Sequence, residues 1–170
     1  VAIASQIPCD PVRLYRNDGG RFTEVSGVAD QTHASGLIAA DYDNDGRADI
    51  YLSHFFGQKN TLYRNLGGLM FVDDSRRTRV AATSFEFNGF GTVPFDYDRD
   101  GWMDIFVTNG HVLGAQQQPY KMHAQLLHND GSGRFHDISS SAGPYLQEFV
   151  LGRCAASADF DNDGDLDLAV

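Results

Sequence analysis

The stretch "DYDNDGRAD" places four aspartates within nine residues, 41 to 49, with a glycine directly after the third. Alternate side chains of an extended loop can converge on one point where a glycine lets the backbone turn sharply. Calcium is a hard cation that takes six to eight oxygen ligands, and three aspartates, one backbone carbonyl, a further aspartate and water make up such a set. Without a cation, repulsion among the carboxylates would raise some of their pKa values or spread the loop. The stretch therefore predicts a calcium site.

The acidic motif occurs three times and alternates with a second motif. Its other copies are "DYDRDGWMD", which begins at Asp96, and "DFDNDGDLD", which begins at Asp159. The second motif reads "RLYRNDGGRF" from residue 13, "TLYRNLGGLMF" from residue 61 and "QLLHNDGSGRF" from residue 125. A single acidic motif would be a weak signal, but three copies in register with three copies of another motif indicate a structural repeat.

Short β-type stretches flank every acidic loop. "GLIAA", "GTVPF" and "CAASA" precede the loops, and "DIYLSHF", "DIFVTNG" and "DLAV" end them, so each loop should connect the strands of a hairpin. The second motif predicts another hairpin, with a tight Asn/Asp/Gly turn and Phe22, Phe71 or Phe135 opening the return strand. No stretch shows a convincing helical period, so we expect almost no helix.

The acidic loops are not EF-hands, although they open in the same way. An EF-hand requires a bidentate glutamate at position 12 and flanking helices. Position 12 here is Leu52, Val107 or Val170, and the fourth carboxylate comes at position 9 instead. The flanking strands point to a different calcium loop.

Two hairpins per repeat give four antiparallel strands in roughly 60 residues, the size of a β-propeller blade. We expect an all-β propeller segment with an outer hairpin in residues 1–30, blades in residues 31–80 and 81–142, and the inner hairpin of a further blade in residues 143–170. These amount to about three blades, whereas propellers close with roughly four to eight. The segment is therefore expected to be part of a larger ring of seven blades, or to be completed by another chain.

Composition agrees with a folded domain that binds cations. The chain has 170 residues, and 23 Asp and Glu against 13 Lys and Arg give a formal charge of -10, which argues against a nucleic-acid partner. Twelve of the acidic residues are aspartates at the inward positions 1, 3, 5 and 9 of the three loops, so the acidity is mostly a metal-site signature. No run of 18 apolar residues predicts a membrane span. Because the chain lacks an initial Met and ends inside an expected strand, we interpret it as a processed chain or a piece of a longer one.

The motifs resemble a known family. "NTLYRNLGG", "GFGTVPFDYDRDGWMDIFVTNGHV" and "LLHNDGSGRFHDISSSAGP" are similar to FG-GAP/VCBS-repeat β-propellers, which include integrin α-subunit heads. More narrowly, they resemble the group with an ASPIC and UnbV module, the cartilage acidic protein-like proteins. The resemblance implies up to three Ca²⁺ ions, each held by Asp side chains at loop positions 1, 3, 5 and 9 and by a main-chain carbonyl at position 7. The implied ligands are Asp41, Asp43, Asp45, Asp49 and the carbonyl of Arg47; Asp96, Asp98, Asp100, Asp104 and the carbonyl of Trp102; and Asp159, Asp161, Asp163, Asp167 and the carbonyl of Asp165.

Several residues depart from the repeat or invite another interpretation. Gly36 and Gly91 stand five residues before the first aspartate of their loops, whereas Cys154 holds that place in the third repeat. Cys154 and Cys9 either form a disulfide, which would suit an oxidising compartment, or remain two unpaired thiols. His128 stands where the other repeats have arginine, so we expect it to act as an ordinary strand residue. We expect packing rather than ligand stacking for the single tryptophan.

The longest unrepeated segment, residues 110–125, is the expected contact surface, because loops on rigid scaffolds carry recognition. Within it His111, Gln117, Tyr120 and Lys121 are our candidates for contacts with a partner protein or a glycan. A plain linker between strands is the alternative.

We expect a non-catalytic function, since none of the six histidines forms a zinc motif and no nucleophile elbow is present. The resemblance implies a secreted, cell-surface or periplasmic protein that serves as an interaction, adhesion or assembly scaffold. The alternative is a carbohydrate-binding or carbohydrate-active propeller, a lectin or a lyase, and a lyase would need a base beside a sugar cleft. A structural subunit of a larger complex is a third possibility.

Overall fold

The computed structural model describes residues 12–25, 28, 34–116 and 118–170. These residues form twelve β-strands and a single turn of 3-10 helix, Tyr145–Gln147, labelled η1. The all-β class and the near absence of helix are therefore confirmed. Among the described residues no helix is long and apolar enough to cross a membrane.

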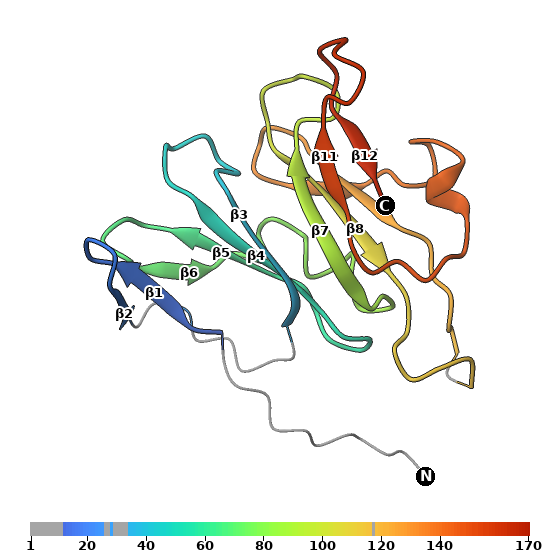
Figure 1. Cartoon of the computed structure of the whole chain (residues 1–170), viewed down its shortest axis with the longest axis horizontal. Helices are drawn as coiled ribbons and strands as arrows, with labels where there is room; N and C mark the ends of the chain where they lie inside the picture. The colour runs from blue at the N-terminus through green and yellow to red at the C-terminus, as the bar shows by residue number, and fades with distance from the viewer. Residues whose placement is uncertain (1–11, 26–27, 29–33, 117) are drawn as a thin grey trace.

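Two four-stranded antiparallel sheets make up the centre of the molecule (Figure 1). The first sheet follows chain order with β3 (Ala34–Ala40), β4 (Asp49–His54), β5 (Thr61–Asn65) and β6 (Phe71–Asp73). The second contains β7 (Gly89–Phe95), β8 (Asp104–Asn109), β9 (Gln125–Asn129) and β10 (Phe135–Asp137), again paired with their chain neighbours. Each sheet is thus a four-stranded unit of the kind expected for a propeller blade.

Two hairpins flank these sheets. The strands β1 (Leu14–Asn17) and β2 (Phe22–Val25) precede the first sheet, and β11 (Ala156–Ala158) and β12 (Asp167–Ala169) follow the second. All six strand pairs predicted from the two motifs are present. Over the part of the chain that the structure describes, the sheets form an open series and do not close into a ring.

Apolar residues from both sheets form the main core. Strands β4 and β8 are buried along their whole length, and each is an inner strand of its sheet. The ring of Tyr42 meets the edge of Phe135 with centroids 5.7 Å apart, which joins the first acidic loop to the second sheet. The buried core comprises Tyr42, Tyr51, Leu62, Val80, Ile105, Val107, Leu127 and Phe135.

The first strands of successive units pack against one another. Strand β3 lies beside β7, and β7 lies beside β11. Gly91 in β7 makes this approach possible, because a Cβ there would lie within 2.5 Å of the backbone of Cys154. Cys154 itself is exposed and forms no disulfide with any of the described residues, and Cys9, the other cysteine, lies outside them.

The three acidic loops lie at the same end of their hairpins, which is the upper end in Figure 1. They connect β3 to β4, β7 to β8 and β11 to β12. The long connection between β8 and β9 leaves from the opposite end of the second sheet. The fold therefore separates the predicted metal loops from the predicted contact surface.

Candidate metal centre

The three acidic loops share one backbone shape. In each loop the fourth residue and the glycine at position 6 have positive φ angles. This left-handed conformation turns the chain twice within six residues, so that the odd-numbered side chains face the inside of the turn. The positive angles belong to Asn44, Arg99 and Asn162, at 55°, 60° and 62°, and to Gly46, Gly101 and Gly164, at 83°, 89° and 93°.

The first aspartate of each loop fastens the turn. Asp41 accepts the backbone N–H groups of Asp45 at 3.1 Å and Gly46 at 2.8 Å. Asp96 and Asp159 accept the equivalent pairs of N–H groups at 2.9 to 3.1 Å. The aspartate at position 5 then accepts the N–H of the residue at position 7, at 2.9 to 3.0 Å in all three loops. Backbone donors hold these carboxylates in place, which leaves their further lone pairs for a cation.

Carboxylate oxygens gather closely in every loop. Within each group, one ligand atom per residue lies within 4.8 Å of the others. Oxygen atoms crowded in this way are the donor set that a hard divalent cation such as Ca²⁺ takes. The groups are Asp41, Asp43 and Asp45; Asp96, Asp98 and Asp100; and Asp159, Asp161 and Asp167.

Asp43 offers a direct test of whether a cation fits the first loop. Its Oδ1 is buried and has no hydrogen-bond partner among the described residues. Burial raises the pKa of Asp43, and the neighbouring charge of Asp45 raises it further. A buried carboxylate oxygen without a partner is costly, and a bound cation would remove that cost. The residues present therefore fit a metal ion.

The aspartate at position 9 of the loop has a second role that the sequence did not reveal. Asp49 is buried, and its Oδ2 accepts the N–H of Tyr42 at 3.2 Å while its Oδ1 accepts the N–H of Asn65 at 2.8 Å. Burial raises the pKa of Asp49, and the two backbone donors oppose that shift. Asp49 thus joins the acidic loop to the next hairpin as well as standing near the predicted metal position.

The second loop has both of these contacts, and the third loop has the contact within the loop. Asp104 accepts the N–H of Tyr97 at 3.1 Å and of Asn129 at 2.7 Å, and burial likewise raises its pKa. Asp167 accepts the N–H of Phe160 at 2.9 Å. The signal in the sequence was the asparagine that ends each "YRN" or "LHN", which the strand prediction treated only as a turn residue.

Residue 7 of each loop was predicted to give a main-chain carbonyl. Its N–H is anchored, as described, and its side chain differs from loop to loop. Arg47 donates to the carbonyl of Asn65 at 2.8 Å and pairs with Asp45. Trp102 is half-buried against Gly131, in agreement with the packing role expected for it. Ligation by the carbonyls of Arg47, Trp102 and Asp165 stays a prediction.

The loops also contact one another. Asn44 of the first loop donates to the carbonyl of Gly101 in the second at 3.0 Å. Arg99 of the second loop forms an ion pair with Asp165 of the third at 2.9 Å. The three predicted metal positions consequently form a continuous row along one end of the sheets.

The predicted contact residues lie away from this row. His111 donates its N–H to the carbonyl of Tyr120 at 2.9 Å, and Gly110 bridges Lys121, so the loop is closed at its base. Burial lowers the pKa of His111, and Arg153 lowers it further. Lys121 is exposed, and Tyr120 is half-buried. Gln117 lies outside the described residues.

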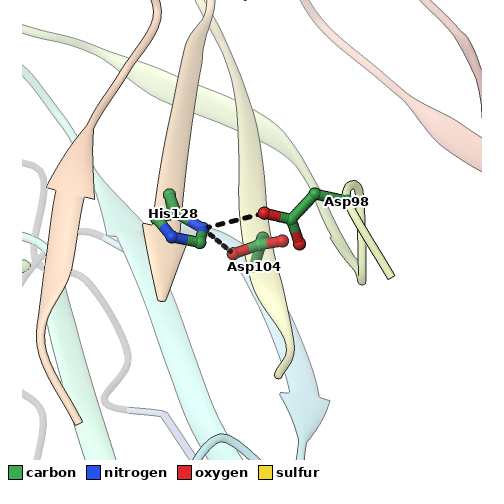
Figure 2. Close-up of side chains that lie close together, drawn as sticks. All are labelled: Asp98, Asp104 and His128. Carbon is green, nitrogen blue, oxygen red and sulfur yellow. Dashed lines mark hydrogen bonds and ion pairs between the residues drawn. The ribbon is translucent and has the colours of Figure 1, made fainter. Parts of the chain in front are cut away.

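His128 lies in β9, as its place in the repeat predicted, but it does more than fill a strand. Its Nδ1 lies 3.2 Å from Oδ1 of Asp104 and 3.9 Å from Oδ2 of Asp98 (Figure 2). The three side chains form a further group whose ligand atoms lie within 4.8 Å of one another. Sequence comparison among the repeats missed this group, because His128 replaces an arginine there.

These loops, and the second hairpins between them, are the features by which the chain can be compared with known proteins. Residues 1–52 match the FG-GAP-like repeat. The chain is also 30% identical over 145 residues to cartilage acidic protein 1 of Xenopus tropicalis, and 29% identical over 143 residues to the Mus musculus protein of the same name. The resemblance noted in the sequence is therefore confirmed.

Both alignments cover 84% of this chain and 20% of the relative. The chain thus spans about a fifth of the length of the curated relatives it matches. Their shared name and the repeat's description refer to no enzymatic activity. The acidic clusters of the structure agree with a cation-binding repeat.

Proposed function

We propose that this chain is a calcium-stabilised β-propeller segment that acts, without catalysis, as an extracellular scaffold for a partner protein. The observation that carries the proposal is the row of three acidic loops with one common backbone shape. A bound Ca²⁺ would supply the positive charge that the clustered carboxylates lack. The side chains that would hold it are the aspartates at positions 1, 3, 5 and 9 of each loop.

The fold supports a structural rather than a sensing role for the ion. Each loop connects two strands of one unit, and in the first two loops the aspartate at position 9 is tied to the following hairpin. Binding would therefore order the two hairpins of a blade together and fix neighbouring blades through the contacts between loops. We infer that the complete propeller has further blades, seven in all, from a longer chain or another subunit.

The partner surface is proposed on the side away from the metal loops. His111 and Phe56 lie together with ring centroids 6.3 Å apart, and Leu113 beside them is exposed. Tyr120 and Lys121 lie on the same closed loop as His111 and Leu113, and Phe56 comes from the connection between β4 and β5, so apolar, aromatic and cationic groups meet on this surface. Such a mixture suits a protein partner, because interfaces favour aromatic residues with charged groups at the rim. A secreted, cell-surface or periplasmic location follows from the resemblance.

Calcium binding can be tested in solution with the second loop as its own reporter. Trp102 is the only tryptophan and lies on that loop, so its excitation should sensitise the luminescence of a bound terbium ion. Adding Ca²⁺ should displace terbium and abolish the signal. A chelator should lower the melting temperature and Ca²⁺ should restore it, with about 2.7 kcal/mol of stabilisation for each site at a hundredfold excess over its dissociation constant.

Asp18→Asn provides a matched control. Asp18 is an exposed acidic residue in the turn of the first hairpin and pairs with Arg16, outside all three loops. It should leave the calcium response unchanged, whereas Asp43→Asn should reduce it. A melting temperature that ignores both chelator and Ca²⁺ would refute the calcium proposal. For the proposed partner surface, binding to glycans on an array without binding to any protein ligand would favour the lectin alternative. Turnover of a glycan would favour the lyase.

A further inference from the structure

The second acidic loop differs from the first at one strand position. Arg64 in β5 and His128 in β9 hold equivalent places in their repeats. Arg64 reaches Asp43, the third residue of the first loop, with Nη1 3.7 Å from Oδ2. His128 reaches the equivalent Asp98 with Nδ1 3.9 Å from Oδ2. Arginine only donates hydrogen bonds, whereas a neutral imidazole nitrogen can bind a metal.

The distances around His128 suit a shared ion. Two ligands bonded at about 2.1 Å lie about 3.0 Å apart when they subtend a right angle and about 3.4 Å apart in a tetrahedron. Nδ1 of His128 and Oδ1 of Asp104 lie 3.2 Å apart, between these two values. Oδ2 of Asp98, at 3.9 Å, is within the roughly 4.2 Å that two such bonds can span. Figure 2 shows both carboxylates turned towards the imidazole.

The neighbouring residues hold this group in place. Asp104 is fully buried, and the N–H groups of Tyr97 and Asn129 each bind one of its oxygens. The edge of the Tyr97 ring packs against the imidazole with centroids 5.6 Å apart, and the histidine side chain remains 23% exposed. The ligand atoms are therefore oriented by their surroundings and still open to an ion from solution.

We propose that His128, Asp98 and Asp104 form a site for a borderline divalent transition-metal ion such as Zn²⁺, distinct from the calcium chemistry of the other loops. Imidazole nitrogen suits Zn²⁺ and its neighbours in the first transition row, whereas calcium takes oxygen ligands almost alone. Water would complete the coordination. The site shares Asp98 and Asp104 with the predicted calcium loop, so at this loop the two ions compete.

Cobalt and zinc titrations of the metal-free 170-residue chain test the site at neutral pH. Co²⁺ should bind saturably, develop visible absorption bands and quench Trp102, and Zn²⁺ should displace it. His128→Gln, and separately His128→Arg, should weaken Co²⁺ and Zn²⁺ binding by more than about tenfold, since even loss of an outer partner of a metal ligand costs 10 to 100-fold. Terbium luminescence from the same loop should persist in the glutamine variant, which shows that the loop is still folded.

His136→Gln is the matched control. His136 lies directly opposite His128 on β10, but its Nε2 contacts Asp130 rather than the metal loop. It should leave cobalt and zinc binding unchanged. Equal binding by wild type and His128→Gln would overturn the proposal, because carboxylates alone would then hold the ion; so would the absence of saturable binding to wild type. If the wild-type protein bound zinc but gave no terbium signal, the calcium proposal would be refuted instead.

Discussion

The buried carboxylate of Asp49 accepts the backbone N–H of Asn65 at 2.8 Å, and Asp104 makes the same contact with Asn129 at 2.7 Å. In return, the amides of the two asparagines donate to the carbonyls of Ala48 and Met103 at 2.9 and 3.2 Å. The first two acidic loops are thus each fastened to the turn of the next hairpin from both sides. This reciprocal contact explains why the two motifs alternate along the chain.

Asp49→Asn should destabilise the protein whether or not calcium is present. An amide can accept only one of the two N–H groups that Asp49 binds, and its NH₂ group would face the other donor in a buried place. We expect a loss of about 1 to 3 kcal/mol in the free energy of unfolding, measured by denaturant unfolding in chelator and again in Ca²⁺.

Asp45→Asn is the companion variant, because among the described residues the Asp45 carboxylate binds only within its own loop, to the N–H and guanidinium of Arg47. In chelator it should change stability by less than about 0.5 kcal/mol, and it should reduce only the gain from Ca²⁺. If Asp49→Asn left the free energy of unfolding in chelator unchanged, the structural role assigned to Asp49 would be wrong.

Gly91→Ala should disrupt the packing between successive units. The new methyl group would lie within 2.5 Å of the backbone of Cys154, and a backbone cannot move aside as the end of a flexible side chain can. We expect a cost of about 1 to 3 kcal/mol or more, seen as a lower midpoint in thermal unfolding.

Cys154→Ala tests the other side of the same contact. Cys154 holds the place of Gly91 in the third repeat, but its side chain is exposed in this chain. Its removal should change stability by no more than about 0.5 kcal/mol. A Gly91→Ala protein as stable as Cys154→Ala would show that β7 and β11 do not pack as closely as described.

The elements could be predicted from the sequence because their signals are local. The strand "LYRN", the turn after it and Phe71, for example, specify their hairpin within eleven residues, and in the structure Phe71 opens the return strand as expected. The loop around Asp41 is equally local, since its donors lie four and five residues ahead. Such patterns lie within one short stretch of sequence, so they can be recognised without knowing how the strands pair in the sheet.

Contacts that depend on strand register could not be read in this way. The bond from Asn129 to Asp104 spans 25 residues, and its bond to Tyr42 spans 87. His128 approaches Asp98 only because β9 lies beside β8, and a comparison of repeats suggested only a substituted arginine. The sequence therefore identified the loops, while the register determined what the loops contact.

Asp130 should make stability depend on pH in the acid range. Its carboxylate accepts the hydroxyl and N–H of Ser132, the N–H of Arg134 and a contact from His136 at 2.9 Å. The Ser132 hydroxyl above all, with His136, holds the pKa of Asp130 well below its usual range. A depressed carboxylate pKa contributes stability above the unfolded value of about 4, and this contribution disappears as the pH falls through the folded value.

Asp130→Asn should therefore lower the free energy of unfolding by roughly 1 kcal/mol at neutral pH, with the difference from wild type shrinking as the pH falls below about 4. Denaturant unfolding in calcium-free buffer from neutral to acid pH measures it. Ser132→Ala should show the same trend with a smaller amplitude, because it removes one of the donors. A difference that grows on acidification would contradict the assignment.

Asn129→Ala should be far more damaging than Asn17→Ala, although both asparagines end the first strand of their hairpins. The buried amide of Asn129 donates to the carbonyls of Met103 and Tyr42, and so joins its own acidic loop to that of the preceding unit. Removing it leaves two carbonyls without this donor, at an expected cost of about 2 to 4 kcal/mol. Asn17 is exposed, and within the described part of the chain its side chain accepts only the N–H of Gly20, so its loss should cost less than about 1 kcal/mol. Thermal and denaturant unfolding of the two variants under identical conditions compares them directly. Equal costs would mean that the bond between units adds nothing to stability, and the unequal costs we expect would make Asn129 a link through which one loop supports the next.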